Sequence, residues 1–147
     1  MRKFFWIILI TLCSPAMAES IPPELVKHLK PFKIEEVNLK GNVLRIRVSS
    51  SVVNQDTFRA IASASCAPLW MNGKKDGWDK AQIDRVEVIN QIGAQGFAFI
   101  GGRKSCADLA NVTGDNEHTF IASRTWVCVA GNPCRPRRDG EKISGDD

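Results

Sequence analysis

The segment IEEVNLKGNVLRIRVS, residues 34–49, places apolar residues at alternating positions on both sides of a central Gly-Asn pair. This alternation is typical of half-buried strands, and a two-residue Gly-Asn loop favours a β-hairpin with a type II′ turn. In the register that this loop sets, Leu39 lies opposite Leu44. Glu36 lies opposite Arg47 on the other face, as a pair of opposite charges. A slip by one residue would lose both matches, so the segment predicts a hairpin of defined register.

Helical patterns lie on both sides of a second alternating segment. Apolar residues at helical spacing follow Asn54, a suitable N-cap, and Pro68 should end this helix. Residues 83–102 then predict a second hairpin. Its last strand, residues 97–100, is almost wholly apolar, which indicates a central strand or one covered on both faces.

The stretch GFAFIGGRKSC, which ends that hairpin, contains glycine, cationic and serine residues, as a phosphate-binding loop does. A P-loop, however, needs glycine directly before its Lys-Ser pair, and Arg103 occupies that position. We therefore exclude nucleotide binding. The S-x-x-D spacing of Ser105 and Asp108 instead predicts a capping box that starts a helix over residues 106–112.

The order of elements predicts the fold class. A short helix near residues 23–30 is followed by two hairpin–helix units, and residues 124–129 form a last strand. Hairpins joined through helices favour an α+β two-layer sandwich. We expect an antiparallel sheet of four or five strands, two of its pairs being the hairpins, with the helices on one face and disulfides as staples.

The first residues, MRKFFWIILITLCSPAMAES, have the pattern of a secretory signal peptide. Arg2 and Lys3 precede a short apolar segment, and Ala-Met-Ala suits a cleavage site. We therefore predict a signal peptide over residues 1–18 and a single domain over residues 19–134. Residues 135–147 are charged and rich in glycine and proline, which predicts a disordered or loosely held tail. The mature protein would be periplasmic or secreted, with no membrane span.

Cleavage at this site leaves four cysteines: Cys66, Cys106, Cys128 and Cys134. An even number in an exported chain predicts two disulfides, although sequence alone does not decide among three possible pairings. Proximity favours a Cys66–Cys106 bond, which would join two helices on one face of the sheet, and a Cys128–Cys134 bond, which would close a small loop. No CxxC pair and no histidine at ligand spacing accompanies them, so we predict neither a metal nor a cofactor.

The charge of the mature chain argues against a polyanionic partner. Arg2 and Lys3 would leave with the signal peptide, so that 18 of the 20 basic residues face 16 acidic ones, a net charge near +2. Nucleic-acid binding normally needs a clustered basic surface. We predict a protein partner and no nucleic acid.

Candidate binding residues lie at two places, the first being a loop flanked by tryptophans and the second a predicted helix start. They are Trp70, Lys74, Lys75 and Trp78 in the loop, and Arg103 and Lys104 at the helix start. Aromatic side chains beside a cationic loop are typical of interface hot spots, and a helix start attracts anions. The alternative is that the tryptophans cover the core and the cations are only solvated.

Catalytic patterns are sparse. His118 next to Asp115 or Glu117 is the one candidate for a general base. The sequence therefore favours a small exported binding or accessory protein of the secretion, transfer, inhibitor or immunity type. Two alternatives stay open: a secreted hydrolase that uses His118, and a thiol–disulfide protein that uses Cys128 and Cys134.

Overall fold

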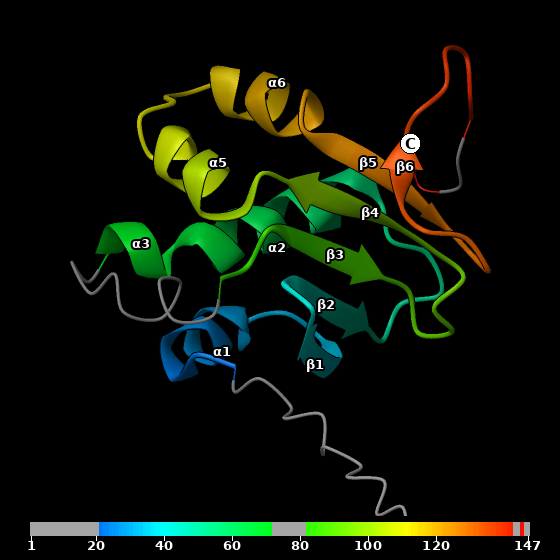
Figure 1. The fold of residues 1–147 in the computed structure, drawn as a ribbon, viewed down its shortest axis with the longest axis horizontal. Helices are drawn as coiled ribbons and strands as arrows, with labels where there is room; N and C mark the ends of the chain where they lie inside the picture. Colours follow the sequence, from blue (N-terminus) through cyan, green and yellow to red (C-terminus); the bar gives the residue numbers. More distant parts are fainter. Residues whose placement is uncertain (1–20, 72–81, 143–144, 146–147) are drawn as a thin grey trace, which may run out of the picture.

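A computed structural model describes residues 21–71, 82–142 and 145 of the chain. The predicted signal peptide lies outside the described residues. The helices are α1 Pro23–Leu29, α2 Gln55–Cys66, α3 Pro68–Met71, α5 Gly102–Leu109 and α6 Asn116–Ala122. The strands are β1 Ile34–Lys40, β2 Val43–Val48, β3 Arg85–Ile89, β4 Gln95–Ile100, β5 Thr125–Val129 and β6 Arg135–Pro136 (Figure 1).

The strands form one mixed, six-stranded sheet in the order β1-β2-β3-β4-β5-β6. Strands β2 and β3 pair in parallel, and the other neighbours are antiparallel. The predicted antiparallel sheet of four or five strands is therefore wrong in number and in direction. The chain returns through α2 and α3 before β3 begins, so β3 runs in the same direction as β2. Strand β6 has only two residues, too few for an alternating pattern to reveal it.

The first hairpin has the predicted register. Leu39 pairs with Leu44, and Glu36 pairs with Arg47. The turn type differs from the prediction, because φ is positive at both turn residues, +53° at Gly41 and +63° at Asn42. Positive φ at both positions defines a type I′ turn, which matches the twist of the two strands as a type II′ turn does.

The core lies between one face of the sheet and the helices. A row of paired positions crosses this face from β1 to β5, formed by Val37, Ile46, Val88, Phe97 and Val127. These side chains pack in one apolar cluster with residues of α1, α2, α5 and α6. The helices thus cover one face of the sheet, as the two-layer α+β prediction requires.

The helix after the first hairpin is confirmed. The Asn54 side chain accepts a hydrogen bond of 2.8 Å from the Thr57 backbone N–H, and α2 ends at Cys66, two residues before Pro68. Ala67 still has helical dihedrals, with φ of −54° and ψ of −36°, so the end comes from Pro68 itself, which has no backbone N–H to continue the hydrogen bonds of the helix. A short separate helix, α3, follows directly.

The second helix begins earlier than predicted. Helix α5 starts at Gly102, and the Ser105 backbone N–H donates to the Gly101 carbonyl at 3.1 Å. Ser105 is thus a buried residue of the first turn, and the predicted capping box is wrong. The N-cap residue is Gly101, whose φ of +102° lies in the left-handed region. Glycine has no side chain to cap the helix, so a search for capping side chains does not find this start.

We expect Gly102→Ala to lower the free energy of unfolding by about 2–4 kcal/mol. The alanine would have to adopt a positive φ, and its Cβ would also clash with the backbone. At φ of +45°, a Cβ on Gly102 would lie well inside contact distance of the Ile83 carbonyl oxygen. Gly114 is the matched control, with φ of +59° and nothing within 4 Å of an added Cβ. Gly114→Ala should cost only about 1 kcal/mol in urea denaturation. Equal losses would show that the approach of Gly102 to Ile83 is unimportant.

Two disulfides join the predicted pairs, Cys66 with Cys106 and Cys128 with Cys134. The first connects the end of α2 to α5 inside the helical layer. The second closes a short loop between β5 and β6. Both are compatible with an oxidising compartment.

The segment predicted to be a loose tail makes specific contacts in its described part. Arg135 lies in β6, and its guanidinium donates to both Glu141 carboxylate oxygens, one of them at 2.9 Å. The Arg138 backbone N–H donates to the same carboxylate at 3.0 Å. Further along, the Gly145 carbonyl accepts a hydrogen bond from the Gln55 backbone N–H. The tail thus runs from the sheet edge to the start of α2.

This attachment should weaken in acid. The Arg135 side chain and the Arg138 backbone N–H lower the pKa of Glu141 from its ordinary value of 4.5 to about 2. Because the folded-state pKa is the lower one, the contact stabilises the attached tail above about pH 4.5 and loses this effect as the pH falls toward 2. Carboxyl-carbon NMR would follow the titration. Arg135→Gln should bring the Glu141 pKa back toward 4.5, and a titration that the variant leaves unchanged would contradict the assignment.

Candidate functional site

We call the face of the sheet opposite the core the open face. It carries a row of side chains that is partly polar, whereas the row on the core face is wholly apolar. Paired positions place Asn38, Arg45, Glu87, Ala98 and Trp126 side by side across β1 to β5. The row is polar on β1 to β3 and apolar on β4 and β5. Its members come from three segments that are distant in sequence.

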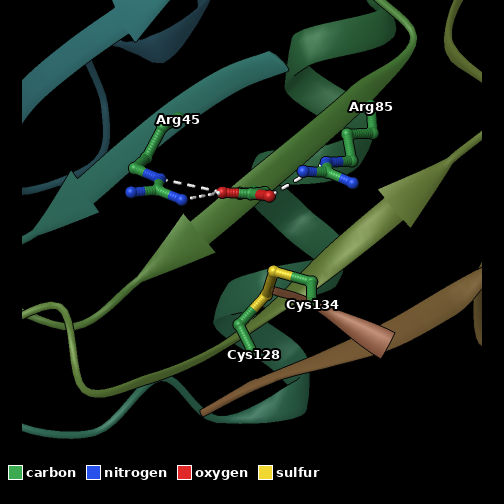
Figure 2. Close-up of a disulfide and its surroundings, with 5 residues drawn as sticks. Arg45, Arg85, Cys128 and Cys134 are labelled. Carbon is green, nitrogen blue, oxygen red and sulfur yellow. Dashed lines mark hydrogen bonds and ion pairs between the residues drawn. A yellow bond between two sulfur atoms is a disulfide. The ribbon is translucent and has the colours of Figure 1, made fainter. Parts of the chain in front are cut away.

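Glu87 is buried at the centre of this face, with only 1% of its side chain exposed. Two Arg45 nitrogens contact its Oε2, Nε at 2.8 Å and Nη2 at 2.7 Å. Arg85 Nε lies 2.9 Å from Oε1, close enough for an ion pair, although the N–H direction lies outside hydrogen-bond geometry. Figure 2 shows the two arginines on opposite sides of the carboxylate. A buried carboxylate thus fixes two guanidiniums from neighbouring strands.

A hollow of about 470 Å³ lies on the open face above these strands. Its charged and amide side chains are Glu36, Asn38, Lys40, Arg45, Arg47 and Arg85. We call this group the arginine hollow. Arg47 pairs with Glu36 across the hairpin, and 40% of its side chain remains exposed. With Glu87 beneath, four cations face two carboxylates, so the hollow has an excess of positive charge.

The other half of the open face is apolar and is held by a disulfide. Cys128 and Cys134 pack with Ile89 and Ala98, and Trp126 is partly buried against them. Figure 2 shows this disulfide on the same side of the sheet as Arg45 and Arg85. Ile89 belongs to the apolar cluster and also lines the hollow, so the two halves are continuous.

This arrangement is suited to binding an anionic group. Each guanidinium has five N–H donors in a planar fork that matches a carboxylate or phosphate. Glu87 occupies two donors of Arg45 and contacts one of Arg85. Arginines that are already oriented lose less conformational entropy when a ligand binds. Within the described ranges, no group of histidine, cysteine, aspartate and glutamate residues is arranged to hold a metal ion.

The predicted binding residues that the structure describes lie in the helical layer, away from the open face. Arg103 and Lys104 are exposed in the first turn of α5, where Lys104 pairs with Asp108 at 2.7 Å. Trp70 belongs to α3, a helix that contacts α5. The structure therefore brings α3, which contains Trp70, into contact with α5, which contains Arg103 and Lys104. Lys74, Lys75 and Trp78 lie outside the described residues, and a binding role for the whole group stays a prediction.

His118, the candidate base, is exposed on α6 and lines a separate hollow of about 420 Å³ between α6 and α2. Glu117 also lines it, although adjacent positions on a helix do not face each other. Asp115 precedes the helix as its N-cap residue. Catalysis by His118 stays a prediction, which an activity screen with His118→Ala would test.

The thiol–disulfide alternative meets an obstacle. Cys128 and Cys134 are each only 6% exposed. Exchange requires a thiolate to reach a disulfide sulfur, and burial hinders that approach. The bond should therefore resist mild reductants, and a bond that is easily reduced would favour the alternative.

Sequence reasoning missed the arginine hollow, although part of the signal was present. The predicted register puts Arg45 and Arg47 on one face of the first hairpin, and Arg85 and Glu87 share a face of the next strand. Local patterns do not reveal that β2 and β3 pair in parallel, and this pairing brings the two sets of side chains together.

Comparison with protein-family models, with curated proteins and with solved structures finds no match to this chain. Among the described helices, none has the length and apolar character needed to cross a bilayer.

Proposed function

We propose that this protein is an exported, disulfide-stabilised binding protein that contacts another envelope or extracellular protein through the open face of its sheet. The observation that carries the proposal is the composition of that face. A pre-oriented set of cations adjoins an apolar surface with Trp126, and both halves are held in place, one by Glu87 and the other by a disulfide.

Such a surface is typical of protein recognition sites. Arginine and tryptophan are enriched among the residues that carry most of the binding energy. Charged groups around an apolar centre supply specificity and faster association. The export prediction and the two disulfides agree with a partner in an oxidising compartment.

A photo-reactive amino acid at Asn38 would test the proposal in cells that produce the protein. Asn38 is exposed and lines the arginine hollow, and Ala60, an exposed residue of α2, is the matched control in the helical layer. We expect one discrete cross-linked protein from position 38 and none from position 60. A third position, Ala107 in α5, reports on binding to the helix surface that contains Arg103, one turn earlier. Cross-links only from position 60 or 107, or none at all, would overturn the open-face proposal.

A further inference from the structure

The chemistry of the arginine hollow narrows the kind of partner, if the open face is the binding surface as proposed above. Its cations come from three strands, Lys40 from β1, Arg45 from β2 and Arg85 from β3 among them. They surround a concave surface, so several can reach one ligand group. Charge-assisted hydrogen bonds between guanidinium and carboxylate are among the strongest that proteins form.

Two observations disfavour a polyanion. Glu36 lines the hollow itself, and the Glu87 carboxylate lies beneath it. Nucleic acids and anionic membranes are bound by extended surfaces that neutralise many phosphates. A hollow that contains its own carboxylates, next to an apolar surface, is poorly suited to such ligands.

The apolar half of the open face disfavours an isolated small anion. Ile89 connects the hollow to the cluster that contains Trp126 and the Cys128–Cys134 bond. A ligand that uses both halves needs an acidic group and an apolar group a short distance apart. An extended peptide segment provides both, because its successive side chains point to opposite sides and alternate ones to the same side.

We propose that the arginine hollow binds an acidic segment of the partner protein, with a carboxylate held by the exposed arginine guanidiniums and a neighbouring apolar side chain against Trp126. Ile89, Cys128 and Cys134 are each 9% exposed or less and support Trp126 from below. Glu87 is a positioning residue in this site: it holds Arg45 and Arg85 toward the ligand from beneath. Glu36 competes with the ligand for Arg47, with which it pairs in the unbound protein.

The test uses the mature protein and three probes: a synthetic peptide of alternating glutamate and leucine, its glutamine–leucine counterpart, and inorganic phosphate. Affinities are measured by NMR titration at low and physiological salt. We expect the acidic peptide to bind at least about tenfold more tightly than the glutamine peptide or phosphate, because charge-assisted hydrogen bonds are about twice as strong as neutral ones. Equal binding of the two peptides, or of phosphate, would overturn the inference.

Variants locate the site without disturbing the buried cluster. Lys40→Gln with Arg47→Gln removes two cations of the hollow and leaves Arg45 and Arg85, the ion-pair partners of Glu87, in place. We expect this variant to weaken the acidic peptide about tenfold, and Glu36→Gln to tighten it about two- to threefold, as complementary charge predicts. Arg103→Gln with Lys104→Gln, the matched control in α5, should leave the affinity unchanged.

The outcomes separate this inference from the proposed function. Cross-links from position 38 together with no preference for the acidic peptide would reject the acidic segment and leave open-face binding in place. Loss of peptide binding in the Arg103–Lys104 variant, with no change in the Lys40–Arg47 variant, would reject the hollow as the site. Absence of cross-links from position 38 would reject the proposed function itself.

Discussion

Replacing both arginines that contact Glu87, as in Arg45→Met with Arg85→Met, should lower the free energy of unfolding by about 3–5 kcal/mol. The variant leaves a carboxylate that is only 1% exposed without either cation. An uncompensated buried charge is among the most destabilising changes that a protein can undergo. Urea denaturation at neutral pH measures the loss.

Two further variants identify the cause. Arg47→Met removes an arginine whose partner, Glu36, is 46% exposed, so it should cost no more than about 1 kcal/mol. Adding Glu87→Leu to the double variant should recover much of the lost stability, because an apolar group of similar volume replaces the buried charge. If the double variant were as stable as Arg47→Met, the buried cluster would not be a stabilising feature.

Removing the Cys66–Cys106 disulfide through Cys66→Ala and Cys106→Ala should cost about 4 kcal/mol. The bond closes a loop with a sequence separation of 40 residues, which strongly restricts the unfolded chain. The same substitutions at Cys128 and Cys134 provide the comparison, since that separation is only 6 residues. The chain-entropy model then predicts a loss of about 2 kcal/mol.

Urea denaturation of the two variants without reductant measures the two losses of stability. A larger loss for the short loop would show that local packing near Ile89 and Ala98, rather than chain entropy, governs the contribution of these bonds.

Local patterns predicted the parts of this fold that depend on near neighbours. The register of the first hairpin follows from alternation and a two-residue loop, and the start of α2 follows from the Asn54 cap. Both disulfides were expected because four cysteines in a chain predicted to be exported have few other uses. The hairpin register and the helix start require no knowledge of how distant segments pair, and the cysteine count alone predicts that disulfides form.

The features that sequence reasoning missed depend on distant segments or on unusual backbone. Helix α6 was missed because it follows a polar stretch and its short sequence shows no distinct apolar face. The start of α5 was missed because its cap is a glycine in the left-handed region and not a capping side chain. The parallel pairing of β2 with β3 leaves no local trace, because direction is set by the whole connection between them. The arginine hollow depends on that pairing and was missed with it.

The junction between β2 and β3 also determines when the proposed binding face appears during folding. The contact of Arg45 with Glu87 and the hydrogen bonds between Val53 and Gln95 each join residues 42 positions apart, whereas the hairpins close over short distances. Contacts of large sequence separation are generally slow to form. A chain with its separate hairpins formed would still lack the arginine hollow, so the ability to bind would coincide with completion of the fold. If the protein is exported and binds through this face as proposed, partly folded molecules would be unable to engage the partner before their sheet is complete.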